Sequence, residues 1–77
     1  MQMHHLSVGE SVRLQNGRLF IRGEVLQLYG DELGRVTEID INCYGIGVHR
    51  LTRGEALWTT TYKIHGRNTW TVEREFV

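Results

Sequence analysis

The amino-acid sequence predicts an all-β domain, a small antiparallel barrel or meander of five to six strands. The clearest observation is in the segment 34–48, where Ile39, Ile41 and Cys43 alternate with polar residues and so share one face of a strand. Glycine-containing turns separate several such alternating segments. The chain of 77 residues has no proline and no helical stripe longer than a turn or two, and this length predicts one domain.

The first two strands are predicted at residues 11–15 and 18–29. Between them, Asn16-Gly17 is typical of a type I′ turn, which requires positive φ at both central positions. We therefore expect a tight hairpin at the start of the domain, preceded by an N-terminal tail at residues 1–6. The remaining residues, 7–77, are expected to form the barrel.

The second strand requires an irregularity. Leu19 and Ile21 lie on one face, whereas Leu26 and Leu28 are out of phase with them. One extra residue has to be accommodated between the two pairs, and Gly23 is the natural position for a β-bulge. Such a bulge bends a strand, as a small barrel requires.

The remaining strands follow from the same alternation. Residues 30–34 form a polar loop, residues 42–45 a turn that ends the central strand, and Ile46 and Val48 resume its inward face. Residues 50–54 are expected to connect to the last hairpin, which comprises a strand at 56–64, a turn at 65–68 and a closing strand at 69–77. Aromatic residues of this hairpin are expected in the core: Trp58, Tyr62, Trp70 and Phe76.

Composition restricts the classes of function. Nine basic and nine acidic residues give a formal net charge of zero, which argues against a general nucleic-acid binder but permits a local basic patch. Cys43 is the only cysteine, and its place on an apolar strand face predicts a buried thiol in a reducing compartment. No apolar run is long enough for a membrane span, so we expect a cytoplasmic location. The histidine spacing predicts no metal site, and we expect no cofactor.

Short motifs near the N-terminus resemble those of a known fold. Val8-Gly9-Glu10-Ser11-Val12 and the later Gly23-Glu24-Val25 look like the openings of KOW and Tudor-type SH3-like barrels. This resemblance covers about the first third of the chain and implies an SH3-like barrel. Domains of this kind would bind a protein or a nucleic acid.

A second resemblance concerns a ligand site. Arg18 and Arg22 form R-x-x-x-R, and Asp40, Asn42 and Gly45 form D-x-N-x-x-G. The pattern resembles PilZ domains, which carry R-x-x-x-R followed by D-x-S-x-x-G and bind cyclic di-GMP. The resemblance implies that the arginines bind phosphate and guanine edges, that the aspartate and asparagine bind guanine, and that the glycine permits close approach. The alternative is that all five are solvated strand and turn residues.

Two further groups of residues are weaker candidates for binding. His49, Arg50 and Arg53 form a local basic patch that could meet phosphate, although a solvated connection is the competing interpretation. The aromatic side chains of the last hairpin could stack bases if they were exposed, but their alternation favours core positions. No motif for a catalytic nucleophile or a phosphate-binding loop is present, and no catalytic residue is predicted.

The sequence therefore predicts a non-enzymatic binding module on a small β-barrel, with a protein or nucleic-acid partner. The alternative is a PilZ-like sensor of cyclic di-GMP, and an enzyme assembled at a subunit interface is a third class. We also expect a homo-oligomer, because the closing strand has no partner after it in sequence. A monomeric barrel whose closing strand pairs with residues 11–15 is the competing architecture.

Overall fold

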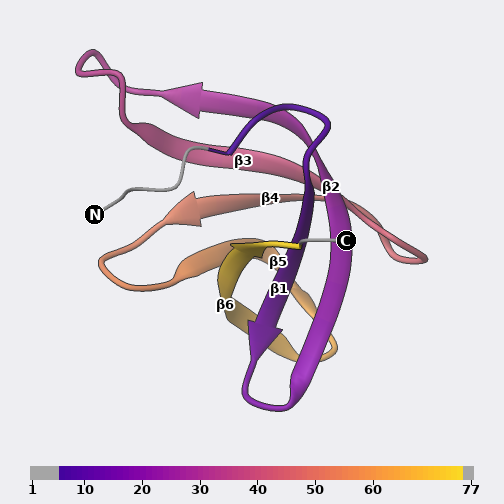
Figure 1. Ribbon diagram of the computed structural model, residues 1–77. Helices are drawn as coiled ribbons and strands as arrows, with labels where there is room; N and C mark the ends of the chain where they lie inside the picture. Colours follow the sequence, from indigo (N-terminus) through magenta and orange to yellow (C-terminus); the bar gives the residue numbers. More distant parts are fainter. Residues whose placement is uncertain (1–5, 76–77) are drawn as a thin grey trace.

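The computed structural model describes residues 6–75, which form six antiparallel strands closed into a barrel (Figure 1). The strands pair in sequence order, and no helix occurs in this part of the chain, so the predicted all-β barrel is confirmed. The strands are β1 (Ser11–Asn16), β2 (Leu19–Gly30), β3 (Val36–Cys43), β4 (Gly47–Arg53), β5 (Trp58–Ile64) and β6 (Arg67–Arg74).

The barrel closes between its first and last strands. β6 pairs with β1 in a register that runs from Val12 opposite Arg74 to Gln15 opposite Thr71. The backbone groups of the closing strand are therefore used within the same chain. The unpaired edge from which we expected self-association is not found within residues 6–75, and the pairing is that of the competing architecture.

The core follows the alternation of the strands. Among residues 6–75, ten apolar side chains are buried, with Trp70 the largest of those that are fully inaccessible. Cys43 is buried beside Ile39 and Ile41, as predicted. Leu6 packs against this core, so this last residue of the predicted tail belongs to the barrel domain. Phe76, expected in the core, lies outside the described residues.

The bulge in β2 lies at Leu26, and the prediction of a bulge at Gly23 is wrong. Val25 pairs with Ile41 and Gln27 pairs with Asp40, so Leu26 is the extra residue and its side chain is 39% exposed. Gly23 lies in regular register opposite Cys43. A Cβ at Gly23 would come within 2.6 Å of the carbonyl oxygen of residue 42 on β3, which explains the glycine as a close approach of two strands.

The return strand after β3 has the opposite inward face from the predicted one. The turn places Gly47 opposite Cys43, and the inward residues of β4 are then His49 and Leu51. Val48 is 58% exposed, so the expectation that it resumes the core face is wrong. β4 also extends to Arg53, through residues that we had assigned to a connection.

The aromatic residues of the last hairpin do not all reach the core. Trp70 is buried and Trp58 is half-buried against the core, but Tyr62 is 74% exposed. Tyr62 lies in the stretch between Thr59 and Ile64, where the pairing of β5 with β6 is irregular, and it departs from the inward face that Thr60 and Ile64 keep.

Candidate functional site

A groove of about 570 Å³ lies at one end of the barrel, where the β2–β3 loop approaches the β4–β5 loop. In Figure 1 this is the left-hand end, at the tips of the β2 and β4 arrows. The lining combines loop residues with the ends of β3, β4 and β5, and consists of Leu6, Asp31, Gly34, Arg35, Val36, Thr37, Thr52, Arg53, Gly54 and Trp58.

The β2–β3 loop is organised by Asp31. One carboxylate oxygen accepts hydrogen bonds from the backbone N–H groups of Leu33 (2.9 Å) and Arg35 (3.0 Å). The backbone N–H of Asp31 donates to the carbonyl of Arg35 at 2.9 Å, and that of Gly34 donates to the carbonyl of Asp31 at 3.0 Å. Gly34 has φ +81°, which a glycine adopts without strain. The loop is thus a closed turn with a defined shape.

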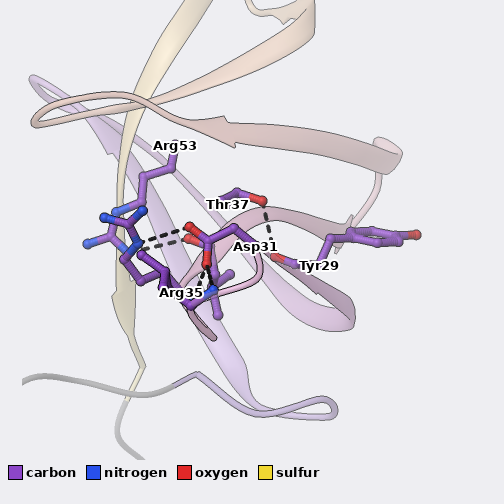
Figure 2. A network of polar contacts seen from close by, with 7 residues as sticks. Tyr29, Asp31, Arg35, Thr37 and Arg53 are labelled. Atoms are coloured by element: carbon purple, nitrogen blue, oxygen red, sulfur yellow. Dashed lines mark hydrogen bonds and ion pairs between the residues drawn. The ribbon is translucent and has the colours of Figure 1, made fainter.

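The same aspartate fixes the side chain of Arg35. Its second carboxylate oxygen accepts a hydrogen bond from Nε of Arg35 at 2.9 Å, as Figure 2 shows. The backbone hydrogen bond from Arg35, with further contributions from its side chain and from Leu33, holds the pKa of Asp31 below its ordinary value. The Arg35 side chain is 69% exposed, so the loop presents its guanidinium group to solvent.

Arg53, at the end of β4, adds a second guanidinium to the groove. Its Nη1 donates to the carbonyl of Val36 at 3.4 Å, and its Cζ lies 5.8 Å from the ring centroid of Trp58. The two residues face each other because Arg53 pairs with Trp58 in the β4–β5 register. The groove therefore brings together two arginines and an indole ring from three different segments of the chain.

Thr37 links the groove to a second polar cluster. Its hydroxyl donates to the carbonyl of Tyr29 at 3.4 Å, and the Tyr29 ring extends away from the loop (Figure 2). The Tyr29 hydroxyl donates to Asp40 at 2.8 Å, and Arg50 donates to the same carboxylate through Nε at 2.8 Å. The Arg50 guanidinium also lies 4.4 Å from the centre of the Tyr29 ring.

In this second cluster, the Asp40 carboxylate accepts hydrogen bonds from both Tyr29 and Arg50. The hydrogen bond from Arg50 is the largest cause of a lowered pKa for Asp40, and the hydrogen bond to Asp40 raises the pKa of Tyr29. Both shifts favour the ion pair as it stands. The cluster therefore acts as a cross-strand contact on the outer face of β2, β3 and β4.

The residues of the PilZ-like pattern lie in two separate regions. Arg18 is in the β1–β2 turn, nine positions before Gln27, which pairs with Asp40, and this corresponds to about 30 Å along β2. Arg22 lies on the outer face of β2 and forms an ion pair with Glu75 at 3.1 Å. The structure thus does not bring Arg18 and Asp40 together.

The other members of the pattern are closer to one another. Asn42 lies opposite Glu24 on the outer face of β3, near Arg22, whose carbonyl accepts a hydrogen bond from the N–H of Tyr44 at 3.0 Å. Gly45, with φ +81°, lies in the β3–β4 turn next to Tyr44. These residues share a neighbourhood, but they line no part of the groove.

The three residues of the predicted basic patch point to different places. His49 is on the inward side of β4, Arg50 is paired with Asp40 on the outer face, and Arg53 lines the groove. Sequence reasoning missed Arg35, which lies directly before the central strand β3. The sequence offers one indication, the turn from Asp31 to Gly34. An aspartate that accepts hydrogen bonds from the backbone of its own turn can also fix the residue that follows the turn, here Arg35.

Comparison with known proteins adds no relative. No protein-family model, no curated protein and no solved structure matches the chain. Within residues 6–75, no group of three or more His, Cys, Asp or Glu side chains is arranged to hold a metal ion. The same residues contain no helix long and apolar enough to cross a membrane.

Proposed function

We propose that this chain is a non-enzymatic binding module that takes an anionic segment of a protein or nucleic-acid partner into the groove at the β2–β3 loop. The observation that carries the proposal is the convergence of Arg35, Arg53 and Trp58 on one groove. Its volume falls within the range of roughly 300–1,000 Å³ that is typical of ligand sites. Two guanidinium groups supply bidentate donors for phosphate or carboxylate.

Tryptophan fluorescence tests this proposal. Trp58 is half-buried at the groove and Trp70 is fully buried, so an occupant of the groove changes the emission of Trp58 alone. Titration with a short polyglutamate and with a single-stranded oligonucleotide should give saturable binding for at least one of them. The signal should be absent in a Trp58→Phe variant.

Charge-removing variants locate the site. Arg35→Gln and Arg53→Gln should each weaken binding, whereas Arg18→Gln, in the β1–β2 turn, should leave it unchanged. Equal loss in all three variants would indicate non-specific attraction to positive charge and would contradict a defined site. Circular dichroism of each variant checks that the barrel is folded.

Cyclic di-GMP is the alternative ligand, and its support is the R-x-x-x-R and D-x-N-x-x-G pattern. The proximity of Arg22, Asn42 and Gly45 favours it, and the distance of Arg18 from Asp40 disfavours it. A thermal shift on adding cyclic di-GMP that disappears in Arg22→Gln, but not in Arg53→Gln, would support this alternative over the groove.

Self-association and location remain separate proposals. We propose a homodimer that uses the C-terminal hairpin, where the exposed Tyr62 offers a flat contact surface. Sedimentation equilibrium should give twice 9.0 kDa, and a Tyr62→Ser variant should shift the mass to that of one chain. A single species of 9.0 kDa for the unmodified chain would refute the dimer. The lone buried thiol supports a cytoplasmic location.

A further inference from the structure

We propose that the groove recognises nucleotide chemistry, a phosphate group joined to a planar base, either as a free nucleotide or as part of a single strand. This inference rests on the proposed binding function and specifies its ligand. Phosphate would meet Arg35 and Arg53, and the base would meet the flat surface formed by Trp58 and the Arg53 guanidinium.

The phosphate half of the site comes from how Arg35 is held. Asp31 engages this side chain through Nε. Among residues 6–75, no hydrogen bond occupies its two Nη groups, which therefore keep four N–H donors for a ligand. Because Asp31 is itself fixed by the backbone of its loop, the guanidinium is positioned before a ligand arrives. A positioned fork binds phosphate with less loss of side-chain entropy than a free one.

The base half of the site comes from Trp58 and Arg53. The indole is half-buried, so one part of it packs on the core while another lines the groove. The guanidinium of Arg53 lies 5.8 Å from the ring centroid and is held otherwise by one long hydrogen bond of 3.4 Å. Bases stack on both indole and guanidinium planes, and a weakly held arginine can adjust to such a ligand.

Hydroxyl groups beside the ring can read a base edge. Thr37 and Thr52 both line the groove, and each donates its own proton to a neighbouring group of the protein, Thr37 to the carbonyl of Tyr29 and Thr52 to the carboxylate of Glu38. Their oxygen lone pairs are then the groups left for a ligand. This arrangement favours a base that presents N–H donors.

The charge of the groove argues against a purely acidic peptide. Two arginines and one aspartate line it, so the formal net charge of the lining is +1. Exposed ion pairs contribute little to binding, and Asp31 repels a second carboxylate. A ligand that binds tightly in this groove therefore needs a planar group as well as an anion, and aromatic stacking supplies the larger share of the binding free energy.

The experiment compares four probes on the full chain at physiological salt, with Trp58 fluorescence and calorimetry as readouts. The probes are a mixed-sequence single-stranded RNA octamer, guanosine monophosphate, an abasic sugar-phosphate octamer and an octaglutamate peptide. We expect a nucleotide probe to bind at least about tenfold more tightly than the abasic octamer and the peptide, because only nucleotides offer both groups. Arg35→Gln and Arg53→Gln should each reduce this affinity by about tenfold, with Arg18→Gln as the unaffected control.

The outcomes separate the inference from the function on which it rests. Tighter binding of the octamer than of the mononucleotide assigns the site to single strands, and equal binding assigns it to free nucleotides. If the peptide or the abasic octamer binds as tightly as the nucleotides with the same arginine dependence, the nucleotide inference fails while the anion-binding groove stands. If none of the probes binds, both proposals fail.

Discussion

Replacement of Gly23 by alanine should be among the most damaging small changes in this barrel. An added Cβ would lie 2.6 Å from the carbonyl oxygen of Asn42 and 2.7 Å from Cγ2 of Ile41, both on the neighbouring strand. Restoring an ordinary contact of about 3.4 Å requires β2 and β3 to separate by roughly 0.8 Å, because the obstacle is backbone. That shift takes nearby hydrogen bonds, such as the one from Tyr44 N–H to the carbonyl of Arg22 (3.0 Å), beyond bonding range.

The expected loss for Gly23→Ala is about 2–5 kcal/mol of unfolding free energy, from overpacking of about 1–3 kcal/mol and one or two weakened hydrogen bonds of about 1 kcal/mol each. For a domain of this size the melting temperature should fall by roughly 10–30 °C, measured by circular dichroism. Gly45→Ala is the matched control. It has φ +81° but no atom within 4 Å of the new Cβ, so it should cost only about 1–2 kcal/mol. A loss at Gly23 no larger than at Gly45 would refute the steric argument.

Three further predictions test the core, the first turn and the groove loop. Burial raises the pKa of the Cys43 thiol to about 11, so native protein should react with a thiol reagent only through unfolding, and Cys43→Ser should cost about 1–3 kcal/mol in urea titration. Because the thiol pKa is higher in the folded than in the unfolded state, the free energy of unfolding should fall as pH rises above about 8.5. Gly17 has φ 63° whereas Asn16 does not have positive φ, so the predicted type I′ turn is wrong at Asn16. Gly17→Val should still lower the melting temperature strongly, and an unchanged value would contradict the steric requirement for glycine at this φ. The pKa of Asp31 is lowered in the folded state, so its ionised carboxylate stabilises the fold above about pH 4, and this stabilisation is lost as pH falls. Asp31→Asn should therefore make the free energy of unfolding less pH-dependent between about pH 5 and pH 2. An unaltered pH profile would contradict the role of the carboxylate.

The fold class could be predicted because alternation is a local property of each strand. Ile39, Ile41 and Cys43 are buried as their spacing required. The position of the bulge could not be predicted in the same way. Val25 and Leu26 are both apolar, and only the pairing of Val25 with Ile41 on β3 decides which of them points inward. The pairing of two strands, and not the sequence of β2 alone, determined the result.

The exposure of Tyr62 likewise could not be predicted from the alternation of its own strand. Its spacing from Thr60 and Ile64 fits a regular strand, and both of those residues are buried. The irregular pairing with β6 between Thr59 and Ile64 turns Tyr62 outward, although no glycine or proline marks the place. The Thr60 hydroxyl donates to the carbonyl of Asn68 at 3.1 Å, and the Asn68 side-chain amide donates to the carbonyl of Thr60 at 3.2 Å. These hydrogen bonds stabilise the irregularity, and they join two residues that meet only when the hairpin forms.

Prediction of the groove would have needed still more knowledge of the tertiary structure. Arg35 belongs to the β2–β3 loop, Arg53 to the end of β4 and Trp58 to the start of β5. Their convergence depends on the β3–β4 and β4–β5 registers together, so no spacing along the chain could reveal it. By contrast, the arginines of R-x-x-x-R are only four apart, yet they lie in a turn and on a strand face with different neighbours. In an antiparallel barrel of short strands, residues that meet at one end come from alternate loops, and a binding site is better sought among loop residues and strand ends than in a compact motif.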